Sequence, residues 1–162
     1  VMIPMCRTVE ERKKVLEVMK EAGLVKGEGG LKVYVMCELP ANVVLAEQFL
    51  QIFDGFSIGS NDLTQFTLGL DRDNSEMSGV ANEKNEAVIE LIKTAIAACK
   101  TANKYSGICG DAPSTFIEFT KFLIDQGIDS ISLSSDAIIK TTLAVLEYEK
   151  VKSSDTNIQM TP

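Results

Sequence analysis

The stretches VMCELP at residues 35–40 and FSIGSNDLTQ at residues 56–65 decide the fold. Each is an apolar run that ends in polar side chains just before a turn, and YSGICGDAPS at residues 105–114 repeats the pattern. Apolar runs without alternation are typical of strands covered on both faces, and such strands form parallel sheets. The carboxyl ends of parallel strands share one edge, so we expect these polar side chains to meet there.

Strand and helix patterns alternate along the chain. Strands are predicted at residues 1–5, 32–39, 53–60, 105–111 and 128–134. Helices are predicted at residues 8–23, 40–51, 83–102, 115–127 and 136–151, with a short helix or turn at 63–70 and a polar loop at 71–81. Two capping boxes are expected to open helices, Thr8 with Glu11 and Thr115 with Glu118.

This order predicts an α/β protein made of about five strand–helix units. A closed (β/α)8 barrel needs eight units and typically about 250 residues, so we expect the C-terminal part of an incomplete TIM barrel. We assign residues 1–151 to this partial barrel and residues 152–162 to a polar, disordered tail. A barrel cut in this way exposes an unpaired strand edge, which predicts a homo-oligomer.

Composition argues against several classes of function. The 162 residues carry a net charge of −7, whereas general nucleic-acid binders need a basic face. No apolar run approaches the roughly 20 residues that span a membrane, and the N-terminus lacks the pattern of a secretory signal. The four cysteines are widely spaced and histidine is absent, which disfavours a zinc site or a disulfide framework. We therefore expect reduced thiols and a cytoplasmic protein.

Five residues at the predicted strand ends could carry chemistry. Glu38 and Asp62 are carboxylates that could share Mg²⁺, which binds a few carboxylates together with substrate oxygens. Asn61 lies in the same turn as Asp62, and Arg72 follows it with a planar fork that suits phosphate or carboxylate. Cys109 lies between glycines that let a substrate approach, and a thiol held there could exchange a proton with carbon.

Each of these residues also has a plainer interpretation. Glu38 could be a rim carboxylate paired with lysine or arginine, and Asn61-Asp62 could cap a helix. Cys109 could be a small buried hydrophobic residue, and Arg72 a solvated surface side chain. The spacing alone does not choose between the two sets of interpretations.

Taken together, VMIP, VMCELP, FDGFSIGSNDLTQFTLGLDRD and GICGDAPS resemble the C-terminal catalytic domain of the phosphoenolpyruvate-utilising enzymes. The resemblance covers about residues 1–150. The family includes phosphoenolpyruvate synthase, pyruvate phosphate dikinase and enzyme I of the sugar phosphotransferase system. The residues of VMCELP and LGLDRD resemble the synthase branch more than the other two. Synthases make phosphoenolpyruvate, AMP and phosphate from ATP, pyruvate and water.

The resemblance implies roles for seven residues, namely Glu38, Gly59, Ser60, Asn61, Asp62, Arg72 and Cys109. Glu38 and Asp62 match the family's two Mg²⁺ ligands. Cys109 matches the cysteine that gives a proton to the methylene carbon of enolpyruvate and removes one from pyruvate in reverse.

The remaining matches concern the phosphate group and the substrate pocket. Asn61 and Arg72 match phosphate-binding residues, and Gly59 and Ser60 match positions that line the pocket. Asp111 departs from the pattern, because family members generally have Gln or Glu there.

The resemblance also implies partners for the chain. In this family the phosphoryl group travels on a histidine of a separate domain, and a further domain binds the nucleotide. Two substrate arginines belong to segments that precede residue 1. We therefore expect negligible turnover from the chain by itself. The alternatives are a domain of the pyruvate phosphate dikinase or enzyme I type, or a non-catalytic module that serves oligomerisation or regulation.

Overall fold

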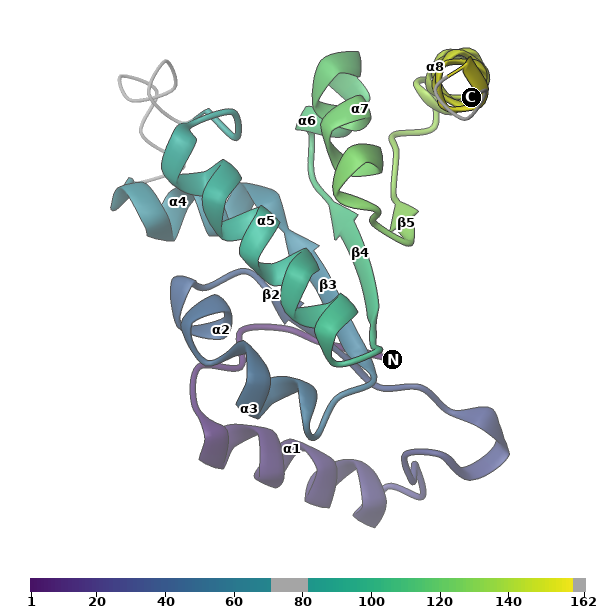
Figure 1. The fold of residues 1–162 in the computed structure, drawn as a ribbon. Helices are drawn as coiled ribbons and strands as arrows, with labels where there is room; N and C mark the ends of the chain where they lie inside the picture. The colour runs from purple at the N-terminus through teal and green to yellow at the C-terminus, as the bar shows by residue number, and fades with distance from the viewer. Residues whose placement is uncertain (71–81, 159–162) are drawn as a thin grey trace.

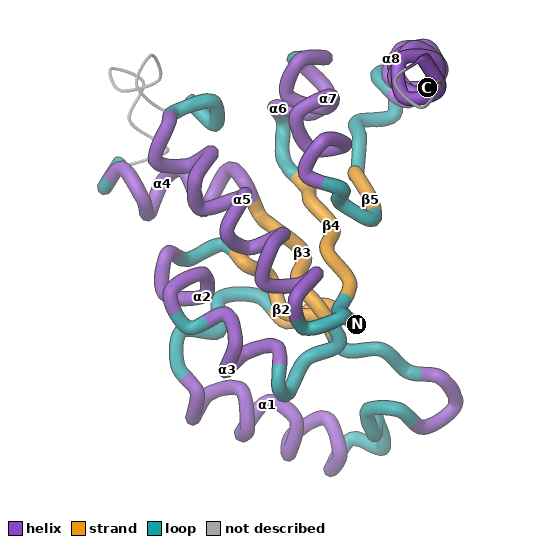
Figure 2. Tube along the Cα trace, viewed as in Figure 1, coloured by secondary structure: helices purple, strands orange, loops and turns teal. Residues whose placement is uncertain are grey.

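The computed structural model describes residues 1–70 and 82–158. Five parallel strands form one sheet in the order of the sequence, as Figures 1 and 2 show. The strands are β1 (Met2–Ile3), β2 (Tyr34–Cys37), β3 (Gly55–Gly59), β4 (Tyr105–Cys109) and β5 (Ser130–Ile131). Each strand pairs with the next one along the chain, which is the progression of a barrel wall. The predicted partial barrel is therefore confirmed.

The helices connect successive strands and cover the sheet. They are α1 (Val9–Glu21), α2 (Pro40–Val44), α3 (Ala46–Leu50), α4 (Ser60–Leu68), α5 (Glu86–Thr101), α6 (Ala112–Thr115), α7 (Ile117–Gln126) and α8 (Ile138–Ile158), with a short 3-10 turn at Glu28–Gly30. In Figure 1, α5 crosses in front of the sheet, and α2 and α3 lie beside it and pack against α5. Helix α5, the longest helix before α8, contacts both β3 and β4. Its apolar face therefore lies against the centre of the sheet.

Successive side chains of each strand point alternately to the hydrophobic core and to the opposite face of the sheet. The buried apolar strand residues that join the core are Val35, Cys37, Phe56, Ile58 and Ile108. The alternate positions Met36, Ser57 and Gly107 pair across β2, β3 and β4, and they share the opposite face. This second face is the inner wall of the partial barrel.

The predicted helices at residues 40–51 and 115–127 differ from the structure. The helix predicted at residues 40–51 is two helices, because Leu45 leaves helical geometry (φ −107°, ψ 26°) between α2 and α3. The capping box of Thr8 and Glu11 is confirmed. The second box is wrong: Thr115 donates its backbone N–H to Asp111 and ends α6. Pro113 suits the first turn of a helix, so a separate turn forms before α7 begins at Ile117.

The C-terminal helix is longer than predicted. Helix α8 continues to Ile158, so residues 152–158 of the predicted tail are helical, and residues 159–162 lie outside the described residues. No glycine or proline interrupts the sequence from 138 to 158. The Tyr148 hydroxyl and the Lys152 ammonium both bind Asp125 on α7, at 2.8 and 2.5 Å, which ties α8 to its neighbour.

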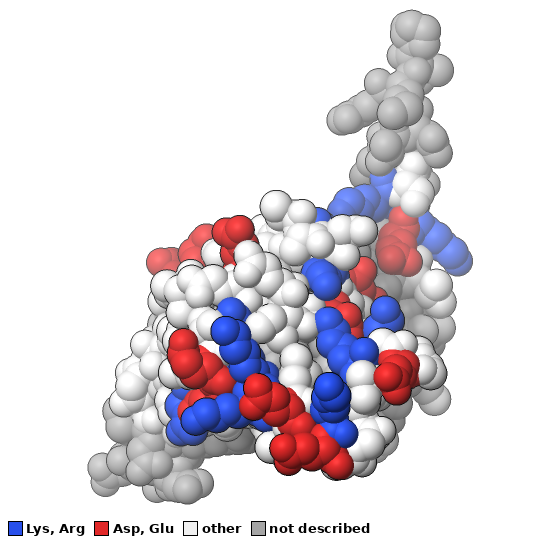
Figure 3. Space-filling model, turned by 90° about the horizontal axis from the view of Figure 1, so that it is seen from below, with Lys and Arg blue, Asp and Glu red and all other residues white. Residues whose placement is uncertain are grey.

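The face shown in Figure 3 carries acidic and basic side chains side by side rather than in fields of one sign. Among the described residues, no helix is both long enough and apolar enough to cross a membrane.

Candidate active site

The sheet register brings three predicted site residues to one edge. Cys37 pairs with Ile58, and Gly59, the next residue, pairs with Cys109. Glu38 follows Cys37, so Glu38, Gly59 and Cys109 lie at the same level on neighbouring strands. A Cβ atom on Gly59 would lie 3.0 Å from Oε2 of Glu38. Glycine at this position therefore leaves room for the carboxylate between β2 and β3.

Glu38 is held by backbone groups of the segment that follows β1. Its side chain is buried, with the residue 4% exposed, and Oε1 accepts the N–H of Met5 at 2.6 Å. Met5 has a positive φ of 50°, which is uncommon for a residue other than glycine. Asn42 fixes the turn after the strand, because its side chain accepts the N–H of Leu39 at 3.0 Å and donates to the carbonyl of Cys6 at 2.8 Å.

The surroundings of Glu38 disfavour its negative charge. Burial raises the pKa of the Glu38 carboxyl, the N–H of Met5 acts in the opposite direction, and the charge of Asp62 raises it further. Among the described residues, Glu38 and Asp62 form no ion pair with lysine or arginine. A bound cation would relieve both the desolvation of Glu38 and the repulsion from Asp62.

The charges of Glu38 and Asp62 also act on the thiol of Cys109. Its thiol is half-buried, and burial raises its pKa above the ordinary value. A hydrogen bond with the Ser57 side chain lowers this pKa, while the charges of Glu38 and Asp62 raise it. The charges of both acids therefore act on the thiol, although the three residues lie at or just after the ends of three different strands.

The turn between β3 and α4 positions the other predicted residues. Ser60 is fully buried, and its hydroxyl lies 3.1 Å from the carbonyl oxygen of Cys109 and contacts the Glu83 carboxylate. Asn61 donates from Nδ2 to Asp111 at 3.0 Å and accepts the backbone N–H of Asp111 at 3.3 Å. The shorter side chain at position 111 thus reaches Asn61 directly. Arg72 lies outside the described residues.

Four residues of this edge were not predicted from the sequence: Met5, Asn42, Ser57 and Glu83. Asn42 had a local signal, because it follows Pro40 in the first turn after the strand, where asparagine often bonds to backbone N–H groups. The others act through contacts between segments that are far apart in the sequence, and no local pattern marks them.

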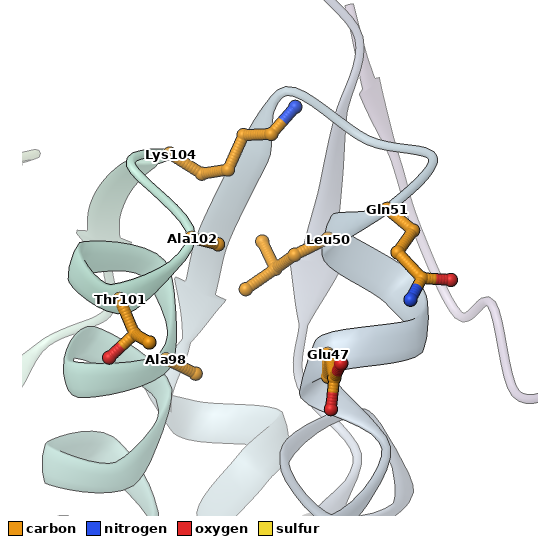
Figure 4. A pocket seen from close by; sticks show the side chains of 7 residues that line it. All are labelled: Glu47, Leu50, Gln51, Ala98, Thr101, Ala102 and Lys104. Atoms are coloured by element: carbon orange, nitrogen blue, oxygen red, sulfur yellow. The ribbon is translucent and has the colours of Figure 1, made fainter.

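The described residues contain no group of three or more Asp, Glu, Cys or His side chains that could hold a metal ion. Two carboxylates without a third protein ligand fit Mg²⁺, which takes its remaining ligands from water and substrate. A groove of about 540 Å³ lies elsewhere, between α3 and α5, lined by Leu50, Ala98 and Lys104 among others (Figure 4). Gln51 and Lys104 of this groove precede β3 and β4, whereas the candidate site lies where these strands end.

Solved structures share the fold. A HpcH/HpaI aldolase/citrate lyase family protein from Burkholderia cenocepacia superposes with a TM-score of 0.62 at 14% identity, over 92% of this chain and 64% of that one. A HpcH/HpaI aldolase from Desulfitobacterium hafniense gives 0.57 at 16% identity, over 99% of this chain and 64% of that one. Identity this low supports the fold alone.

Sequence relatives carry the assignment further. Phosphoenolpyruvate synthase of Aquifex aeolicus is 62% identical over 150 residues, which are 93% of this chain and 18% of that protein. The Escherichia coli enzyme of the same name is 51% identical over 93% of this chain and 19% of its own length. The chain thus spans about a fifth of these relatives. The model of the PEP-binding domain of PEP-utilising enzymes matches residues 1–150, and the chain belongs to this family.

Proposed function

We propose that this chain is the part of a phosphoenolpyruvate synthase that binds pyruvate and phosphoenolpyruvate and moves the proton on carbon. The observation that carries the proposal is the arrangement of Cys109 with Glu38 and Asp62. The thiol pKa responds to both carboxylates: Glu38 directly follows β2, and Asp62 lies in the first turn of α4, which follows β3. The names of the relatives favour the synthase over a dikinase or enzyme I.

Glu38 and Asp62 are the residues that would hold Mg²⁺. The Met5 N–H uses Oε1 of Glu38, while Oε2 lies beside Gly59. When bound, the ion supplies a positive charge that stabilises the enolate of pyruvate. Burial and the nearby charge of Asp62 disfavour the charged form of Glu38 without a cation, and this physical cost supports the assignment.

Cys109 acts as acid in one direction and as base in the other. When pyruvate forms, the thiol proton moves to the methylene carbon of the enolate, and the sulfur keeps the electron pair as thiolate. In the reverse direction the thiolate takes a proton from the methyl group. The raised pKa of Cys109 favours the thiol, and the Ser57 hydrogen bond supports the thiolate.

Asn61 and Arg72 are the residues that we assign to the phosphate group. Nδ2 of Asn61 carries two protons, and the bond to Asp111 uses one of them. Gly59 and Ser60 line the pocket through their backbone, since the Ser60 hydroxyl is already occupied by Glu83 and the carbonyl of Cys109.

The full reaction needs groups that this sequence does not contain. The chain has no histidine, so we assign the phosphoryl carrier and the nucleotide site to separate domains. We further propose that the chain self-associates. Its apolar residues Ile139, Leu143 and Leu146 are exposed on α8, and they support a covered surface in an assembly. The four free cysteines support a reducing compartment, the cytoplasm.

A chimera tests the function directly. Residues 1–150 replace the matching 150 residues of the A. aeolicus enzyme, and phosphoenolpyruvate formation is measured with ATP, pyruvate and Mg²⁺. We expect an active chimera that loses about 10²-fold or more of its kcat with Cys109→Ala. Cys99→Ala is the matched control, because Cys99 is buried on α5. Full activity of the Cys109→Ala chimera overturns the proposal.

A further inference from the structure

Glu83 reaches the candidate site from outside the strand ends. It lies three residues before α5 begins at Glu86. Its Oε1 forms a hydrogen bond with the Ser60 hydroxyl, at the first residue of α4. The same oxygen would lie 2.8 Å from a Cβ atom on Gly110, the residue after β4. One carboxylate therefore bonds to the turn after β3 and lies beside the turn after β4, where glycine leaves room for it.

Ser60 links this carboxylate to the backbone of Cys109. The Ser60 side chain is fully buried, and its Oγ lies 3.1 Å from the carbonyl oxygen of Cys109. A Cβ atom on Gly110 would collide with the same Oγ. Glu83, Ser60 and the backbone of Cys109 and Gly110 are thus packed without room for another methyl group.

The neighbouring residue makes a second contact across the same gap. The Lys84 ammonium lies 3.7 Å from the centroid of the Phe116 ring, between α6 and α7. The Asn82 side chain accepts the N–H of Lys84 at 2.9 Å, which fixes the turn that presents both residues. Residues 82–84 therefore join the turn after β3 to the segment after β4.

We propose that Glu83 is a positioning residue for Cys109, acting through the Ser60 hydroxyl and the main chain of Gly110. It holds the end of β4 so that the thiol faces the two carboxylates. The importance of that orientation for catalysis rests on the proposed function, whereas the contact itself does not. Because the serine hydroxyl has one proton for two acceptors, the contact with Glu83 also fixes where that proton points.

The reactivity of the Cys109 thiol measures this positioning without any turnover. Iodoacetamide is added to the chain, and modification at Cys109 is followed by mass spectrometry; Cys6, Cys37 and Cys99 are buried. Hydrogen exchange of the peptide spanning residues 105–111 is measured alongside. We expect Glu83→Ala to speed both by about threefold or more, because local opening exposes the strand end.

Two further variants separate positioning from charge. Glu83→Gln should stay within about twofold of wild type, because its amide can donate to Ser60 and leave the hydroxyl proton to the carbonyl of Cys109. Glu86→Ala removes an exposed acid in the first turn of α5 and should change nothing. If circular dichroism shows that Glu83→Ala does not fold, Ser60→Ala takes its place and should give the same acceleration.

Wild-type rates in Glu83→Ala, or equal rates in Glu83→Ala and Glu83→Gln, overturn the proposal. The second result would mean that charge alone sets the reactivity. Neither result bears on the chimera with Cys109→Ala, so failure of the positioning role and failure of the proposed function can be told apart.

Discussion

Carboxylates at the two ends of the sheet differ in their hydrogen-bond and ion-pair partners. At the amino end, Asp54 accepts the N–H of Val33 at 2.8 Å and pairs with Lys26 at 3.3 Å. Asp129 likewise accepts the N–H of Ser106 at 2.8 Å. At the carboxyl end, Glu38 is buried with the charge of Asp62 nearby, and the described residues supply neither acid with a cationic partner.

The pKa values follow this difference. Burial alone would raise the pKa of Asp54, but the Val33 N–H and Lys26 outweigh it and hold the pKa below its ordinary value. The pKa of Glu38 is raised, chiefly by burial. The charged form of Asp54 at the amino end therefore stabilises the fold, whereas the charged form of Glu38 at the carboxyl end costs free energy.

The largest expected effect comes from the glycines at the two ends of β3. A Cβ atom on Gly55 would collide with the backbone of Tyr105, which cannot move aside. We expect Gly55→Ala to lower the free energy of unfolding by about 3 kcal/mol, measured by urea denaturation. Gly59→Ala meets Oε2 and Cβ of Glu38 at 3.0 and 3.1 Å, contacts that a shift of a few tenths of an ångström relieves, so it should cost less, about 1 kcal/mol. Equal losses of unfolding free energy in Gly55→Ala and Gly59→Ala would contradict this difference between the two ends of β3.

Asp54→Asn is expected to cost about 1–2 kcal/mol at pH 7, because it removes the charge that pairs with Lys26 and weakens the bond from Val33. The pKa of Asp54 is lowered in the folded state, so its contribution is present above its ordinary pKa of 3.8 and is lost as the pH falls. The difference between the variant and wild type should therefore shrink by pH 3. A difference that grows on acidification would contradict the structural role of Asp54.

Glu38→Gln should have the opposite effect on stability. The raised pKa means that the folded state binds the proton more tightly, so the cost of the charge is absent below the ordinary pKa of 4.5 and grows as the pH rises. Without Mg²⁺, we expect the variant to be more stable than wild type by roughly 1 kcal/mol at pH 7.5 and equal to it at pH 4. Thermal unfolding at both pH values provides the check, and a destabilised variant at pH 7.5 refutes the prediction.

The smallest effect is expected far from both ends. Lys152 binds Asp125 at 2.5 Å on the exposed side of α7 and α8, and its side chain is 54% exposed. Surface pairs of this kind contribute little because solvent screens them, so Lys152→Ala should leave the midpoint of urea denaturation within error of wild type. A lower midpoint would mean that α8 depends on this pair rather than on its packing against α7.

The sequence predicted which residues lie near the carboxyl end of the sheet better than it predicted where the short helices begin and end. Apolar runs with polar ends located Glu38, Asp62 and Cys109, because strand ends of a parallel sheet share one edge. The break at Leu45 and the extra turn before α7 were missed, since tertiary contacts decide where short helices stop.

The supporting contacts of Met5 and Ser60 could not be predicted from the sequence. Met5 reaches Glu38 from 33 residues away, and Ser60 reaches the carbonyl of Cys109 across 49 residues. Helix and strand periodicity describes neighbours within one element, so it contains no information about such pairs. The electrostatic contrast between Asp54 and Glu38 likewise depends on the Lys26 contact, which only the folded chain forms.

Binding of Mn²⁺, followed by the loss of its free electron paramagnetic resonance signal, tests the central claim most directly. Mn²⁺ is a suitable probe because it takes oxygen ligands as Mg²⁺ does. We predict one site in the wild-type chain, weakened about tenfold or more by both Glu38→Gln and Asp62→Asn and unchanged by Asp54→Asn. Wild-type affinity in both variants at the carboxyl end would contradict a shared metal site there.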